Sequence, residues 1–194
     1  MRPLGEYASG LRITGGVLCN RTVDVPPGII RPSMDRMRES VFASLGDISG
    51  LSFLDIFSGT GIIALEAASR GAGYIEAVEA DKLKRKTILS NSSISPVRIN
   101  CRFMAAELYI RRARRSFDLI FLDPPFDYRF KWELLADIAH SALVTNETKI
   151  IIHRPREDFQ KNPIEYLEKL DSREYGRSIV DFFSCLKPCN AKEN

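Results

Sequence analysis

One stretch, residues 51–61, constrains the fold more than any other. It reads LSFLDIFSGTG, an apolar run that ends in a glycine turn. The run has the length of a buried strand, and an apolar helical pattern follows from Ile62 to Gly71. Glycine at positions 59 and 61 lets the backbone turn tightly and come close to a ligand. A strand that passes through such a turn into a helix is the first unit of an α/β sheet.

The same alternation of strand and helix continues to residue 153. It predicts a Rossmann-like, doubly wound and mostly parallel sheet with right-handed crossovers. A short helix is expected after residue 104, where it carries a cluster of arginines at positions 111–115. The expected strands are 51–57, 74–78, 97–104, 117–122 and 149–153, and the longer expected helices are 62–71, 81–91 and 132–143.

Antiparallel elements are expected on both sides of this core. Residues 166–175 and 178–184 meet at Gly176 and predict a C-terminal hairpin that completes the sheet. Near the start, 11–14 and 22–25 predict a short pair of strands around a Gly-Gly turn, and a helix follows with Ser33 as its N-cap. We therefore divide the chain into an N-terminal arm, residues 1–45, and a main domain, residues 46–194.

Composition places the chain among ordinary globular proteins. Of its 194 residues, 44% are hydrophobic and 27% are charged, which excludes a collagen or a disordered chain. No apolar run reaches about 18 residues, and the first 20 residues lack the apolar core of a secretory signal. A cytoplasmic protein is expected.

The balance of charge is informative through its distribution. The 28 basic and 25 acidic residues give a net charge of +3, too small by itself to predict a nucleic-acid partner. The N-terminal arm, however, holds six arginines and no lysine. Arginine suits bidentate contacts with phosphate, so the arm is a candidate surface for a phosphate backbone.

The cysteines do not predict a metal site. Cys185 and Cys189 are close in sequence, but Cys19, Cys101 and both histidines lie far from them. A structural zinc ion needs four converging ligands, which commonly come as close pairs. We interpret the cysteines as free thiols of a reducing compartment.

The glycine turn is a candidate cofactor site. Gly59, Gly61 and Ala64 match the dinucleotide pattern G-x-G-x-x-G/A, and Glu79 follows at the end of the next strand. A carboxylate there can accept hydrogen bonds from both hydroxyl groups of a ribose. Asp55, four residues before the first glycine, would repel a pyrophosphate but would attract an ammonium group. S-adenosylmethionine is therefore favoured over a dinucleotide.

A second motif, Asp123-Pro124-Pro125-Phe126, ends the strand at 117–122. Two prolines cannot continue a strand, so they form a rigid turn at the carboxyl edge of the sheet. The Asp123 carboxylate and the Pro124 carbonyl can both accept hydrogen bonds from one amino group, and Phe126 can stack on a base. The motif therefore predicts methylation of an exocyclic amine, although a rigid turn without a chemical role is the alternative.

Motifs spread over residues 11–185 resemble those of the RsmD family of 16S rRNA guanine-N2 methyltransferases. They read RITGG, RPSMDRMRESVF, LDIFSGTGIIALEAASRGA, VEAD, FDLIFLDPPF and YGRS. The resemblance implies a class I methyltransferase whose main domain, residues 46–194, is catalytic. The implied cofactor is S-adenosylmethionine, and no metal is needed. The implied partner is 16S rRNA. We expect the enzyme to act as a monomer on an assembling small subunit.

The resemblance also implies roles for single residues. Many relatives have an Asp or Asn that binds the amino group of the adenine, whereas this chain has Ala105 at that position. The family's basic RGR-type stretch reads Cys19-Asn20-Arg21 here. Catalysis is assigned to Asp123, Pro124, Pro125 and Phe126. The cofactor is assigned to Asp55, Phe57, Gly59, Gly61, Glu79 and Ala105, and RNA to Arg12, Arg21, Arg31, Arg36 and Arg38.

The function that follows is transfer of a methyl group to N2 of a guanine in 16S rRNA, by resemblance guanine 966. Two alternatives remain open. A DNA adenine-N6 methyltransferase would use the same DPPF motif but typically needs additional target-recognition sequence. An RNA-binding or ribosome-assembly module without catalysis would keep the arginine-rich arm but would not require Glu79 and Asp123 at strand ends.

Overall fold

The computed structural model describes residues 10–25, 33–160 and 162–186. The strands in this part of the chain are β1 (Leu11–Arg12), β2 (Thr22–Val23), β3 (Ser52–Ile56), β4 (Tyr74–Val78), β5 (Ile99–Arg102), β6 (Leu119–Leu122), β7 (Lys149–Pro155), β8 (Leu167–Tyr175) and β9 (Ser178–Cys185). The helices are α1 (Ser33–Leu45), α2 (Ile62–Ser69), α3 (Arg85–Ser92), α4 (Ala106–Arg112) and α5 (Lys131–His140), with a short 3₁₀ helix, η1, at Lys82–Lys84.

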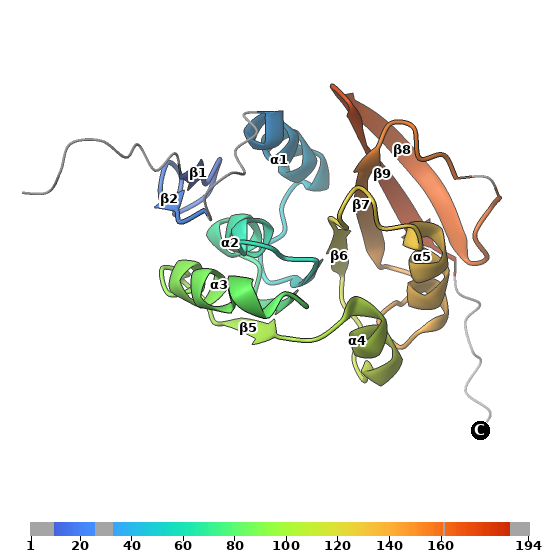
Figure 1. Cartoon of the computed structure of the whole chain (residues 1–194), viewed down its shortest axis with the longest axis horizontal. Coiled ribbons are helices and arrows are strands. Elements are labelled where there is room, and N and C mark those ends of the chain that lie inside the picture. The colour runs from blue at the N-terminus through green and yellow to red at the C-terminus, as the bar shows by residue number, and fades with distance from the viewer. Residues whose placement is uncertain (1–9, 26–32, 161, 187–194) are drawn as a thin grey trace, which may run out of the picture.

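Seven strands form one sheet in the order β5-β4-β3-β6-β7-β9-β8, and β1 and β2 form a separate antiparallel pair (Figure 1). The first five strands of this order are parallel, whereas β9 runs antiparallel to β7 and β8 antiparallel to β9. The predicted Rossmann-like fold with a C-terminal hairpin is confirmed. The chain leaves β3 for β4 on one side and returns to β6 on the other, so the carboxyl ends of β3 and β6 flank the position where such sheets bind ligands.

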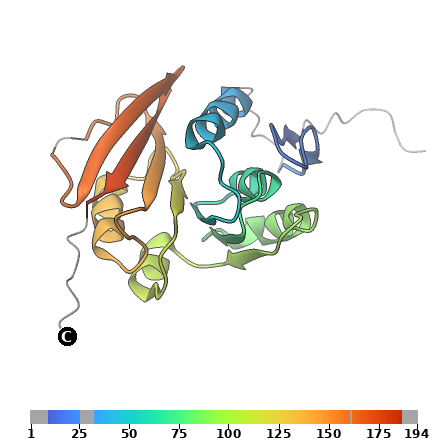
Figure 2. The ribbon, with the colours of Figure 1, turned by 180° about the vertical axis from the view of Figure 1, so that it is seen from behind.

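Side chains of each strand alternate between the two faces of the sheet. Phe53 packs in the hydrophobic cluster that contains α1, α2 and α3, and Leu54 in the cluster that contains α4 and α5. Phe121 and Ile151 share the face of Phe53, on neighbouring strands. Two helical layers therefore enclose the sheet, as the views in Figures 1 and 2 show.

The described part of the N-terminal arm packs on the main domain. Ile13, Val23 and Val41 are buried in the same cluster as α2, and Figure 1 shows β1, β2 and α1 beside α2. The boundary between residues 45 and 46 stays a prediction. No helix of residues 10–25, 33–160 and 162–186 is long and apolar enough to cross a membrane.

Candidate functional site

The glycine turn after β3 has the left-handed backbone that its sequence requires. Gly59 and Gly61 have φ angles of 59° and 81°, and Phe57 adopts φ 64° without being glycine. A Cβ atom on Gly61 would lie 3.0 Å from the side chain of Ile88. A left-handed conformation at a residue other than glycine, such as Phe57, lowers the stability of the fold by about 1–3 kcal/mol. Such residues often lie at functional sites.

Asp55 lies under this turn and is fully buried. Its Oδ2 accepts hydrogen bonds from Ser58 Oγ (2.6 Å) and from the Ala64 backbone amide (3.2 Å), whereas Oδ1 has no partner among the described residues. Burial, with a smaller contribution from the nearby carboxylates of Asp123 and Glu79, raises the pKa of Asp55 from its ordinary value of 3.8 to about 7. This carboxyl group would gain stability as an anion if a cation approached Oδ1.

The raised pKa predicts how stability depends on pH. Because the folded state binds a proton at Asp55 between about pH 4 and pH 7 and the unfolded state does not, this group lowers the free energy of unfolding as pH rises through that window. Asp55→Asn, which cannot ionise, should therefore be more stable relative to the wild type at pH 8 than at pH 5. Urea titrations at the two pH values measure the difference. A stability difference that is independent of pH would contradict the assignment.

Glu79 directly follows β4 and bonds to the glycine turn. Its Oε2 accepts the Gly59 amide at 2.8 Å and its Oε1 accepts the Asp81 amide at 2.8 Å, while Lys84 Nζ lies 3.6 Å from Oε2. Each carboxylate oxygen can accept a further hydrogen bond. The glycine turn thus fixes the carboxylate of Glu79, which was predicted to bind the cofactor beside this turn.

The turn after β6 brings the second motif to the same edge of the sheet. Asp123 continues from β6 with its amide bonded to the Ile56 carbonyl of β3 at 3.2 Å. Lys131, almost fully buried, donates to the carbonyls of Phe126 (3.0 Å) and Tyr128 and pairs with Asp158 at 2.9 Å. Lys131 therefore fixes the backbone directly after the two prolines, and this keeps the turn rigid.

Both motifs line one cavity of about 500 Å³, a size typical of small-molecule sites. A second cavity of about 150 Å³ shares Phe57, Gly59, Lys84 and Asp123 with it and reaches Asp55. The tip of the β8–β9 hairpin and one residue of α1 also line the larger cavity. Its lining residues are Met37, Phe57, Gly59, Glu79, Lys84, Asp123, Pro124, Pro125, Phe126, His153, Tyr175, Gly176, Arg177 and Ser178.

Two predicted cofactor residues lie outside these cavities. Gly61 begins the turn into α2 and packs on Ile88. Ala105 is exposed at the start of α4. Within the described residues, neither lines either cavity, so contact between Ala105 and an adenine ring stays a prediction.

The predicted RNA-binding arginines divide into exposed and buried groups. Arg12, Arg21 and Arg36 are exposed, and Arg31 lies outside the described residues. Arg38 is 0% exposed. A guanidinium without exposed surface cannot contact a phosphate, so the RNA-binding role predicted for Arg38 is wrong for this structure.

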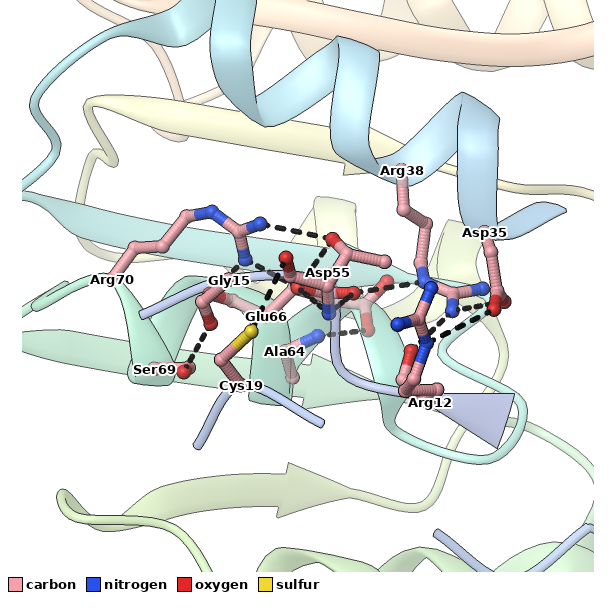
Figure 3. A network of polar contacts seen from close by, with 11 residues as sticks. Arg12, Gly15, Cys19, Asp35, Arg38, Asp55, Ala64, Glu66, Ser69 and Arg70 are labelled. Atoms are coloured by element: carbon pink, nitrogen blue, oxygen red, sulfur yellow. Dashed lines mark hydrogen bonds and ion pairs between the residues drawn. The ribbon is translucent and has the colours of Figure 1, made fainter. Parts of the chain in front are cut away.

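Arg38 instead anchors the arm to the main domain (Figure 3). From α1 it donates to Glu66 Oε1 of α2 at 3.0 Å, to Asp35 at 2.7 Å and to the carbonyl of Arg12 at 2.7 Å. Glu66, also buried, accepts the Thr14 amide and pairs with Arg70. The network fixes β1 and α1 against the helix that follows the glycine turn.

Sequence reasoning missed three residues at this edge of the sheet. Lys84 and His153 line the cavity, and Lys131 lies under the DPPF turn. Lys131 had a signal, because a cation at the first residue of a helix opposes the helix dipole and needs a specific partner. His153 had one too, because it is the last residue of the predicted strand 149–153, and Asp123 directly follows the predicted strand 117–122.

The chain matches the family model described as "Conserved hypothetical protein 95" over residues 11–184. It is 32% identical over 130 residues to "Ribosomal RNA small subunit methyltransferase D" of Escherichia coli strain K12, a match that covers 64% of this chain and 65% of the relative. A relative of the same name from Haemophilus influenzae is 31% identical over 127 residues, 60% of this chain and 61% of the relative. The match thus spans slightly less than two thirds of these relatives.

Solved structures share the fold. The protein yhhF from Escherichia coli superimposes with a TM-score of 0.79 at 24% identity and covers 90% of this chain and 97% of its own. A conserved hypothetical protein from Streptococcus pyogenes gives 0.71 at 26% identity, over 76% of this chain and 94% of its own. Because the family model matches most of its length, this chain belongs to the conserved hypothetical protein 95 family, the RsmD family that its motifs resemble.

Proposed function

We propose that this protein transfers a methyl group from S-adenosylmethionine to the N2 amine of a guanine in 16S rRNA, at the position that the family resemblance gives as 966. The observation that carries the proposal is that Asp123–Phe126 and the glycine turn line one cavity. The printed names of two relatives, small-subunit rRNA methyltransferases, support the RNA substrate. We place the reaction in an assembling small subunit, with the enzyme acting as a monomer.

The residues of the glycine turn suit this cofactor. Asp55 Oδ1 is buried without a partner in the described part of the chain, and the carboxylate of Glu79 lines the larger cavity beside the glycine turn. A ligand with an ammonium and a sulfonium group complements the carboxyl groups of Asp55 and Glu79, whereas these groups would repel a pyrophosphate. Glu79 would hold the ribose and Asp55 would lie near the methionine end. When bound, the cofactor supplies an electrophilic methyl group on sulfur.

The protein's own contribution is to position the amine. The Asp123 carboxylate and the Pro124 carbonyl would accept both hydrogens of one amino group and direct its nitrogen lone pair toward the methyl donor. Phe126, 38% exposed at the cavity rim, offers its face to the extruded base. Asp123 is also the group placed to accept the proton that the amine loses. Such positioning can supply most of the rate acceleration.

Removal of the Glu79 carboxylate should weaken cofactor binding. Glu79→Ala is expected to cost about 1.5–3 kcal/mol, the range for hydrogen bonds to a charged group. Calorimetry with S-adenosylhomocysteine measures this loss, and Glu79→Gln separates loss of charge from loss of the contact with Gly59. Glu147→Ala, an exposed change in the loop before β7, is the control. Unchanged affinity in Glu79→Ala, or micromolar affinity of the wild type for NAD, would refute the cofactor assignment.

The exposed arginines of the arm should contribute to RNA affinity. Arg21→Ala is expected to weaken RNA binding and to reduce the slope of log affinity against log salt by about 0.7–0.9, the value of one phosphate contact. Filter binding at several salt concentrations measures the slope. Lys149→Ala serves as control. Lys149 is exposed at the start of β7, so it lies at the edge of the sheet opposite the carboxyl ends that line the cavity. An equal slope in wild type and Arg21→Ala would remove this arginine from the interface.

Radiolabelled methyl transfer tests the proposed function. The wild-type protein is incubated with labelled S-adenosylmethionine and either deproteinised 16S rRNA or small subunits, and the labelled nucleotide is mapped. We expect one labelled guanine in the 16S rRNA. Label on adenine in DNA would indicate the alternative methyltransferase, and RNA binding without label would indicate an assembly module.

A further inference from the structure

His153, within β7, lies beside Asp123, the residue that directly follows the neighbouring parallel strand β6. Leu122 of β6 pairs with Ile152 of β7, so the next residue of each strand lies at the same level of the sheet. The Nδ1 atom of His153 lies 2.8 Å from Oδ1 of Asp123. The imidazole is only 7% exposed and the carboxylate 24% exposed, and both line the larger cavity.

The direction of this hydrogen bond follows from the chemistry of its partners. An ionised carboxylate can only accept hydrogen bonds, so Nδ1 of His153 carries the proton. The His153 ring also packs in a T-shaped arrangement with the ring of Phe126, at 5.7 Å between centroids and 64° between planes. Among the described residues the Asp123 side chain makes no other hydrogen bond or ion pair, which leaves Oδ2 for the cavity.

We propose that His153 is a positioning residue that fixes the Asp123 carboxylate for the target amine, an inference that rests on the methyl transfer proposed above. The Nδ1–H group holds Oδ1 and thereby sets the rotation of the carboxylate about its last bond. Oδ2 then points to one location, where it accepts a hydrogen from the amine. Without His153 the carboxylate rotates freely, and the amine is held in the reactive orientation for a smaller fraction of the time.

Two substitutions of nearly equal shape separate this role from simple packing. His153→Leu removes the donor, whereas His153→Asn places an amide N–H where Nδ1 was but loses the ring. We expect the single-turnover rate of methyl transfer to fall about 10- to 100-fold in His153→Leu and to be largely restored in His153→Asn, with cofactor affinity unchanged in both. Equal rates in wild type and His153→Leu would overturn the proposal. Equally slow Leu and Asn variants would assign the effect to ring packing and would overturn it as well.

A double substitution tests whether His153 acts through Asp123. In the Asp123→Ala background, His153→Leu should change the rate by less than about twofold, because the group that it positions is gone. A full additional 10- to 100-fold loss would mean that His153 acts independently of Asp123 and would contradict the proposal.

Nuclear magnetic resonance gives a readout that does not depend on activity. The chain has two histidines, so ¹⁵N-histidine labelling with His140→Gln as an assignment variant identifies the His153 signals. We expect the Nδ1–H form in the wild type and a change of tautomer or exchange in Asp123→Ala. A His153 spectrum that is indifferent to Asp123→Ala would overturn the inference even in a protein that methylates. If no substrate is methylated but the tautomer changes as expected, the hydrogen bond stands and the proposed function fails.

Discussion

Asp123→Ala should lower the single-turnover rate of methyl transfer by two or more orders of magnitude. The backbone of Asp123 is fixed by its bond to the Ile56 carbonyl and its carboxylate by His153, so the carboxylate can meet the amine without reorganisation. Removing one such preorganised contact costs about 3–4 kcal/mol in activation free energy. Rapid mixing of enzyme and bound cofactor with excess rRNA measures the rate.

The control for this variant lies in the same loop. Asp127 is exposed, and Asp127→Ala should methylate at the wild-type rate. Cofactor affinity should survive in Asp123→Ala, because Glu79 and the glycine turn are unchanged. If the DPPF motif were only a rigid turn, Asp123→Ala would lose stability but keep a near-normal rate per folded molecule, and that result would end the catalytic assignment.

Arg38→Met should be the most destabilising of the single changes considered. Glu66 would remain fully buried with Arg70 as its one remaining ion-pair partner in the described chain. Breaking a buried ion pair from one side typically costs about 3–5 kcal/mol. Methionine keeps much of the arginine stem, so most of the loss reflects the missing charge. Urea unfolding at neutral pH measures it.

The matched control is Arg36→Met on the same helix. Arg36 is exposed, and surface changes of this kind are usually within about 0.5 kcal/mol. Similar losses in Arg36→Met and Arg38→Met would contradict the anchoring role of Arg38. Weaker RNA binding by Arg38→Met under conditions in which it stays folded would restore the RNA-binding role that its burial excludes.

Elements with a strong local pattern could be predicted from the sequence. The strand Tyr74–Val78 has its predicted bounds, and the C-terminal hairpin turns at Gly176 as expected. Strand alternation and glycine turns are encoded within a few residues, so one sequence suffices. Because parallel strands place their carboxyl ends at one edge, the two motifs, 60 or more residues apart, could also be expected to meet.

Features that depend on distant partners could not be predicted. Among the arm's arginines nothing in the local sequence distinguishes Arg38, whose partner Glu66 is 28 residues away. The Asp123–His153 hydrogen bond joins residues 30 positions apart and depends on the register of β6 and β7. The raised pKa of Asp55 likewise follows from burial under the turn, which a sequence motif does not reveal.

Identification of the modified nucleoside tests the central proposal most directly. Small subunits are incubated with S-adenosylmethionine and either the wild type or Asp123→Ala. The RNA is then digested to nucleosides, and the methylated products are identified by mass spectrometry. We expect N2-methylguanosine from the wild type and at least a hundredfold less per unit time from Asp123→Ala. Methylation of a ring nitrogen or of adenine, or an equal yield from both proteins, would contradict amine methylation by the Asp123–Phe126 turn.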